Sequence, residues 1–100
     1  MGLCIIGAKD IKDYQLRKNA ILIDLRDSEE YMRFHINGAV NVPVEELEQY
    51  MKRASRNRNY IFCCQHGSLS LQEGKRYVRK GYQICSLAGG VLAYRQTFHR

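Results

Sequence analysis

Two apolar runs, at residues 21–25 and 60–63, constrain the fold of this chain more than any other feature, and the first turns polar only near its end, at Asp24. The first reads Ile-Leu-Ile-Asp-Leu and the second reads Tyr-Ile-Phe-Cys, so neither alternates between apolar and polar residues along its length. Such runs are typical of strands that are buried on both faces, as in the centre of a parallel sheet. The sequence therefore predicts a sheet with helices packed on both of its sides.

Strand-like and helix-like segments alternate along the rest of the chain. Further strands are expected at residues 3–6, 39–42 and 82–86, and helices at 8–18, 28–34, 45–53, 70–80 and 91–98. This alternation indicates βαβ units and a mostly parallel sheet. We expect an α/β fold with a central sheet of about five strands, flanked by helices on both faces, in a single domain that spans residues 1–100.

Charge and hydropathy exclude several classes of protein. The formal net charge is +6, and no apolar run approaches the roughly 20 residues that a membrane helix requires. The first residues lack the basic flank and long apolar stretch of a signal peptide, so a cytoplasmic protein with no membrane partner is expected. Nucleic acid is not an expected partner, because no recognised motif interleaves basic and aromatic residues. The positive charge serves solubility or draws in small anions.

The four cysteines, Cys4, Cys63, Cys64 and Cys85, do not form an obvious disulfide framework. Cys4, Cys63 and Cys85 lie in apolar, strand-like runs, and a core of this size needs no covalent crosslinks. A bridge between the neighbours Cys63 and Cys64 would be strained. No Cys-x-x-Cys or His-x-x-x-His spacing indicates zinc. We therefore expect no structural disulfide, no bound metal and no cofactor.

Cys64 is the strongest candidate for a nucleophile. It directly follows a buried strand and begins a loop, Cys64-Gln65-His66-Gly67-Ser68-Leu69, that leads into a helix expected to start near Ser70. The unpaired N–H groups and the dipole of a helix N-terminus favour negative charge there. Gly67 permits a backbone conformation that directs several N–H groups at one point. This setting is suited to a reactive thiolate, and the same donors would stabilise a terminal sulfur bound to Cys64 as a persulfide.

The alternative interpretation is that Cys64 is a buried, inert residue, which is the common role of a lone cysteine between a strand and a helix. Cys63 provides the contrast. Strand alternation turns its side chain away from that of Cys64, so we expect Cys63 to pack in the core, as Cys4 and Cys85 do.

Three blocks of sequence together resemble the rhodanese-like sulfurtransferase family. They are Leu22-Ile23-Asp24-Leu25-Arg26-Asp27-Ser28-Glu29-Glu30-Tyr31, then His35-Ile36-Asn37-Gly38-Ala39-Val40-Asn41-Val42-Pro43, and finally Cys64-x-x-Gly67-x-x-Ser70 with Lys80-Gly81-Tyr82 and Leu87-Ala88-Gly89-Gly90-Val91. The resemblance covers roughly residues 11–94. In loop character the chain is most similar to the small single-domain members that act on thiosulfate.

The resemblance implies a sulfur-transfer reaction in two steps. Cys64 would take the outer sulfur of a small anionic donor such as thiosulfate, and a thiol, cyanide or a protein acceptor would then remove it. The binding loop would comprise residues Gln65, His66, Gly67, Ser68, Leu69 and Ser70. Many members of the family have arginine at the position of Leu69, where it would attract an anionic donor, and this chain lacks that charge. His66 could supply part of that charge when it is protonated.

Asp24 and Arg26 have two interpretations. Arg26 could lie at the mouth of the site and assist in binding anions. The two side chains could instead connect the end of their strand to neighbouring loops, and we favour this structural interpretation.

Two other functions compete with an enzyme of sulfur transfer. One is a non-catalytic or protein-partnered sulfur carrier. The other is a phosphatase or arsenate reductase of related fold, which would need a loop one residue longer that ends in arginine. The loop from Cys64 to Ser70 is the shorter form, so this last interpretation is the least favoured.

Overall fold

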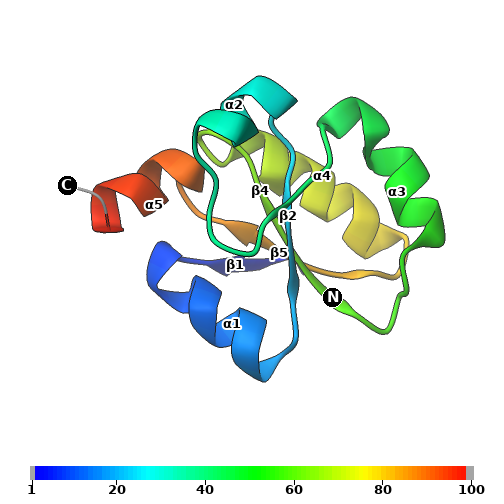
Figure 1. The fold of residues 1–100 in the computed structure, drawn as a ribbon. Coiled ribbons are helices and arrows are strands. Elements are labelled where there is room, and N and C mark those ends of the chain that lie inside the picture. The colour runs from blue at the N-terminus through cyan, green and yellow to red at the C-terminus, as the bar shows by residue number, and fades with distance from the viewer. Residues whose placement is uncertain (1, 99–100) are drawn as a thin grey trace.

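The computed structural model describes residues 2–98, in which helices and strands alternate (Figure 1). The strands are β1 (Cys4–Ile6), β2 (Ile21–Asp24), β3 (Val40–Asn41), β4 (Asn59–Cys63) and β5 (Gln83–Leu87). The α-helices are α1 (Ile11–Arg17), α2 (Ser28–Arg33), α3 (Leu47–Arg53), α4 (Ser68–Arg79) and α5 (Gly90–Phe98), and the 3₁₀ turns η1 (Ala8–Asp10) and η2 (Val44–Glu46) precede α1 and α3. All the predicted elements are present. The predicted start of α4 at Ser70 is wrong, because this helix begins at Ser68.

The five strands form one sheet in the order β1-β5-β4-β2-β3, and every neighbouring pair is parallel. The predicted α/β fold with a five-stranded parallel sheet is therefore confirmed. Because all strands run in one direction, their carboxyl ends meet at a single edge of the sheet. β4 is the central strand, so the loop that follows it lies between the loops that follow β2 and β5.

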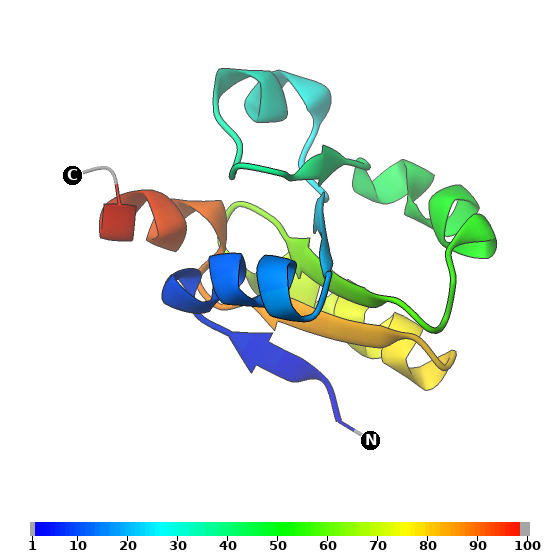
Figure 2. The same ribbon diagram turned by 60° about the horizontal axis from the view of Figure 1, so that its bottom comes forward.

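Alternate side chains of the central strand enter two separate cores. Tyr60 and Phe62 belong to the core beneath α3 and α4, whereas Ile61 and Cys63 belong to the core beneath α1 and α5. All four side chains are at most 2% exposed. Figure 2 shows α1 and α4 on opposite faces of the sheet. This double burial explains why β2 and β4 are apolar along most of their length and do not alternate with polar residues.

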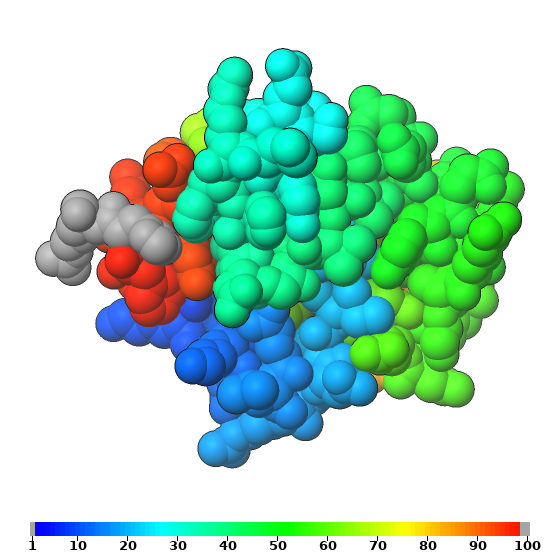
Figure 3. Space-filling model, in the orientation of Figure 1, coloured from blue at the N-terminus to red at the C-terminus, as the bar shows by residue number. Residues whose placement is uncertain are grey.

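The segment from α2 to β3 extends across the edge where the strands end. In Figure 3 it occupies the middle of the visible face, with α5 to its left and α3 to its right. It is anchored by Tyr31, whose hydroxyl donates a hydrogen bond of 2.6 Å to the carbonyl of Ala39 and whose ring packs on the core beneath α1 and α5. The position of α2 makes it one wall of the surface around the β4–α4 loop.

Cys4 and Cys85 form a disulfide, so the expectation of no structural disulfide is wrong. The two residues lie 81 positions apart in the chain, but β1 pairs with β5 in a register that places Cys4 directly opposite Cys85, with Cα atoms 4.3 Å apart. The sequence does not show that Cys4 and Cys85 are close in space, because it does not give the order of the strands. Cys63 and Cys64 are free.

Within residues 2–98, no helix has both the length and the apolar character needed to cross a membrane. The cytoplasmic location stays a prediction.

Candidate active site

Cys64 directly follows the central strand, and a three-residue connection separates it from α4. Gly67, the residue before the helix, adopts φ +103°, a left-handed conformation that residues with a Cβ rarely adopt. This turn lets the amide of Leu71 bond to the carbonyl of Gly67 at 3.1 Å, which starts the helix earlier than the sequence predicted. The earlier start brings the first N–H groups of α4 close to the thiol.

The sulfur of Cys64 accepts two backbone hydrogen bonds. The N–H of Gly67 lies 3.2 Å from Sγ and that of Ser70 lies 3.3 Å from it. The Ser70 amide is one of the first N–H groups of α4, which have no carbonyl partner within the helix. The residue is only 5% exposed, so these donors act on a sulfur with little access to water. Fixed donors in such surroundings stabilise negative charge on sulfur.

A second helix holds the same loop from the opposite side. The amides of Val91 and Leu92, at the start of α5, donate to the carbonyls of Cys64 and Gln65 at 2.8 and 3.1 Å. Gly90 makes this approach possible, because a Cβ at that position would clash with both carbonyl oxygens. The loop is thus fixed between the N-termini of α4 and α5.

A buried pair of hydroxyls ties the start of α4 to the sheet. The oxygen of Ser70 lies 2.8 Å from that of Ser86 in β5 and donates to the carbonyl of Gly67 at 3.1 Å. Both serines are at most 2% exposed. This contact positions the Ser70 amide that donates to Cys64, and Ser86 was missed in the sequence because only the tertiary fold brings β5 beside α4.

Cys63 differs from its neighbour in both position and chemistry. Its side chain is fully buried in the core beneath α1 and α5, as predicted. Burial raises the pKa of the Cys63 thiol well above its usual range, and the nearby charge of Asp24 raises it further. Cys63 therefore stays a protonated thiol at neutral pH.

Asp24 and Arg26 form a buried pair at the end of β2. Both nitrogens Nε and Nη2 of Arg26 lie within 3.3 Å of the Asp24 carboxylate. Burial by itself lowers the pKa of Arg26, but the hydrogen bonds and the charge of Asp24 outweigh it and raise the pKa overall. Nη2 also donates to the carbonyl of Phe34, and Nη1 donates to Oε1 of Gln65 at 3.2 Å. The pair thus connects β2, the end of α2 and the loop of Cys64.

A shallow pocket of about 360 Å³ opens above Cys64. It is lined by Leu25, Arg26, Asp27, Glu30, Val44, Glu45, Cys64, Gln65, His66, Ser68 and Leu69. Cys64 and four of the predicted loop residues thus share one pocket with Arg26. The other two, Gly67 and Ser70, contribute through their backbone N–H groups, and Asp24 contributes through Arg26.

Five lining residues were not predicted as part of the site from the sequence: Leu25, Asp27, Glu30, Val44 and Glu45. Asp27 caps the start of α2 and Glu30 lies in its first turn, whereas Val44 and Glu45 follow β3. They could have been found from the predicted parallel sheet, because the segments that follow β2 and β3 lie at the same edge of the sheet as the loop that follows β4.

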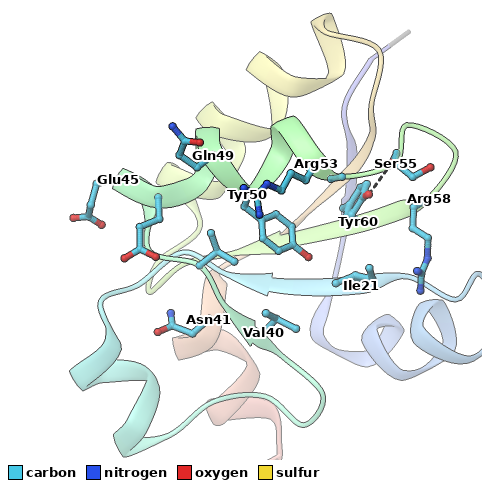
Figure 4. A pocket seen from close by; sticks show the side chains of 13 residues that line it. Ile21, Val40, Asn41, Glu45, Gln49, Tyr50, Arg53, Ser55, Arg58 and Tyr60 are labelled. Carbon is cyan, nitrogen blue, oxygen red and sulfur yellow. Dashed lines mark hydrogen bonds between the residues drawn. The ribbon is translucent and has the colours of Figure 1, made fainter.

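A larger groove of about 770 Å³ lies between α3 and the strands β2 and β3 (Figure 4). Tyr50 and Tyr60 line its interior, and Glu45 is the one lining residue that it shares with the pocket above Cys64. Cys64 does not line it, so the larger hollow is separate from the candidate nucleophile.

Residues 7–97 match the family model described as Rhodanese-like domain. This match covers β4, the cysteine Cys64 that directly follows it, and the tight loop whose amides face the sulfur of Cys64. The chain belongs to the rhodanese-like domain family.

Similar proteins of known name include several sulfurtransferases. A tRNA sulfurtransferase of Pyrobaculum aerophilum is 32% identical over 78 residues, which are 78% of this chain but only 16% of that protein. A thiosulfate sulfurtransferase GlpE of Shewanella oneidensis is 29% identical over 81 residues, which are 80% of each protein. Among solved structures, a rhodanese-related protein of Thermoplasma volcanium superposes with a TM-score of 0.85 at 23% identity, covering 97% of this chain and 95% of that one. This last likeness concerns the fold alone.

Proposed function

We propose that this chain is a sulfurtransferase in which Cys64 carries a sulfane sulfur atom as a persulfide. The observation that carries the proposal is the pair of amides, from Gly67 and Ser70, that donate to a nearly buried Sγ. Two fixed donors are suited to stabilise first a thiolate and then the negative outer sulfur of a persulfide. Relatives named thiosulfate sulfurtransferase and tRNA sulfurtransferase support the same class of reaction.

The first step loads the sulfur. The Cys64 thiolate attacks the outer sulfur of the donor, which is thiosulfate or a persulfide. A new S–S bond forms to Cys64 while the S–S bond of the donor breaks, and its electron pair leaves with sulfite or with the donor thiolate. The chemistry is nucleophilic displacement at sulfur and needs no metal or cofactor.

The second step unloads the sulfur. A thiol or cyanide attacks the outer sulfur of the Cys64 persulfide, and the electron pair of the broken S–S bond returns to Cys64 as a thiolate. The products are a new persulfide or thiocyanate. The amides of Gly67 and Ser70 would stabilise the leaving thiolate, so the same donors assist both steps.

A protein-partnered sulfur carrier is the second candidate. The pocket above Cys64 is shallow and its lining comes from exposed as well as buried residues, so a protein segment could present its thiol there. A carrier would load sulfur on Cys64 but release it slowly to small acceptors. Turnover with cyanide therefore separates the enzyme from the carrier.

The test measures both the loaded protein and the turnover. The protein is incubated with thiosulfate or with cysteine persulfide, and intact-mass spectrometry with peptide mapping follows the gain of one sulfur atom. Thiocyanate formed after addition of cyanide gives the rate. We expect wild-type protein and Cys63→Ala to load and turn over, and Cys64→Ser to do neither. Absence of sulfur on Cys64 from both donors would disprove the proposal.

A further inference from the structure

The pocket above Cys64 is acidic, although the chain as a whole is basic. Three carboxylates line it, from Asp27, Glu30 and Glu45. They come from the start of α2 and from the turn after β3, so two separate elements bring negative charge to the same opening. A negative rim raises the local concentration of cations and lowers that of anions.

Arg26, the one arginine or lysine among the lining residues, does not offset the three carboxylates. Arg26 is held by the fully buried carboxylate of Asp24, with Nη2 and Oδ2 2.9 Å apart, and it donates further to the carbonyl of Phe34 and the amide oxygen of Gln65. Its charge is therefore matched within the protein. Leu69, which also lines the opening, contributes an apolar side chain that packs partly on the core.

Several of the positive charges lie far from this pocket. Lys18, Arg56, Arg58 and Lys80 lie in the loops that lead into β2, β4 and β5, at the edge of the sheet opposite to Cys64. Figure 4 shows this polarity in the larger groove, where Glu45 lies at one end and Arg58 at the other. At an ionic strength of 0.1 M, charges act over about 10 Å, so distant cations are screened from the site more strongly than the carboxylates that line it.

Building on the proposed function, we propose that Cys64 exchanges sulfur with positively charged thiols and persulfides, and that Asp27, Glu30 and Glu45 select them over dianionic thiosulfate. A cationic persulfide would approach the rim with its charge near the three carboxylates. Thiosulfate would be repelled by the same groups. The acidic residues determine specificity, and they take no part in the displacement at sulfur.

The transfer step itself is balanced with a persulfide donor. The Cys64 thiolate attacks the outer sulfur of the cationic persulfide, the S–S bond of the donor breaks, and its electron pair leaves on the donor sulfur as a thiolate. That thiolate takes a proton from water. The ammonium group of the donor is unchanged, so its charge affects only approach and binding.

The test compares donors that differ in charge. The probes are cysteamine persulfide, which is cationic, the persulfide of 3-mercaptopropionate, which is an anion of similar size, and thiosulfate. The second-order rate of sulfur loading on Cys64 is measured by mass spectrometry at low and high salt. We expect the cationic probe to load about tenfold or more faster than the anionic one at low ionic strength, and this ratio to fall towards one at high salt.

A charge-neutralised variant links the effect to the three residues. Asp27→Asn, Glu30→Gln and Glu45→Gln are combined, and asparagine at position 27 keeps the side-chain oxygen that accepts from the Glu30 amide at the start of α2. The matched control combines Asp13→Asn, Glu48→Gln and Glu73→Gln, which changes the net charge equally but lies outside the pocket. We expect only the pocket variant to lose the preference and to load from thiosulfate several-fold faster than wild type.

The outcomes separate this inference from the proposed function. If Cys64 loads equally fast from both persulfides at low salt, or if the control variant changes the preference as much as the pocket variant, the charge selection is wrong while sulfur transfer stands. If Cys64 loads from no donor, sulfur transfer itself fails.

A further probe, the persulfide of a cysteine peptide with lysines on both sides of the cysteine, is compared with cysteamine persulfide to identify the source of the positive charge. Faster loading of Cys64 from the peptide indicates that the partner is a basic protein segment. Equal or slower loading indicates that it is a small cationic thiol.

Discussion

The side chains of Asp24 and Arg26 form an ion pair that is almost completely removed from water, with exposed fractions of 0% and 6%. The two residues also share a short local contact, since the amide of Arg26 donates to Oδ1 of Asp24 at 3.0 Å. Through Phe34 and Gln65 the guanidinium then reaches α2 and the loop of Cys64. The structural interpretation of this pair is therefore supported by its contacts, and Arg26 also lines the pocket.

Removal of the arginine should strongly destabilise the fold. Arg26→Gln leaves the Asp24 carboxylate buried without its partner, and breaking a buried pair in this way costs about 3–5 kcal/mol. The free energy of unfolding is measured by urea denaturation, with Arg33→Gln, at an exposed position of α2, as the control. The control should change the stability by less than about 0.5 kcal/mol. Equal effects of the two substitutions would show that the buried pair contributes nothing specific.

Loss of the Ser70–Ser86 hydrogen bond should lower the free energy of unfolding measurably, because both hydroxyls are buried. Ser70→Ala removes one hydroxyl and leaves that of Ser86 buried without this partner, which costs about 1–3 kcal/mol. Replacement of both serines by alanine should cost less than the sum of the two single substitutions, because no polar group is then left unpaired. Ser28→Ala, at an exposed position, is the control. Strictly additive effects would contradict the predicted coupling.

Gly90 should tolerate no side chain. Its φ of +66° is unfavourable for alanine, and a Cβ would meet the carbonyls of Cys64 and Gln65. We expect Gly90→Ala to lower the free energy of unfolding by about 2 kcal/mol or more and to slow sulfur loading on Cys64. Gly2→Ala is the matched control, since nothing lies within 4 Å of a Cβ there. A stable Gly90→Ala with a normal loading rate would mean that α5 does not fix the loop.

The Cys4–Cys85 disulfide should contribute strongly to stability, because it closes a loop of 81 residues. Crosslinks over such distances typically stabilise proteins by about 2–4 kcal/mol, mainly by restricting the unfolded chain. Thermal unfolding is measured with and without reductant, for wild type and for Cys4→Ala with Cys85→Ala. The reductant should lower Tm for wild type and leave the double variant unchanged. A wild-type Tm that is insensitive to a reductant shown to cleave the bond would contradict this.

Much of the site followed from the sequence because its determinants are local. Cys64 ends an apolar run, Gly67 comes three residues later, and a helical pattern follows, so the thiol at a helix N-terminus could be predicted without any long-range contact. The exact start of α4 could not, because Gly67 takes its left-handed conformation against Gly89, whose amide nitrogen lies 3.0 Å from where a Cβ would be.

The sequence by itself determined the alternation of buried strands and helices, the choice of Cys64 as the candidate nucleophile, and the packing role of Cys63. Tertiary structure decided what lies around them. The order of the strands places Cys4 opposite Cys85, and the shared edge of β2, β3 and β4 brings Asp27, Glu30 and Glu45 to the opening above Cys64. Local patterns follow from backbone geometry and periodic burial, which short segments encode. Pairing of distant segments depends on how the whole sheet assembles, and no short segment carries that information.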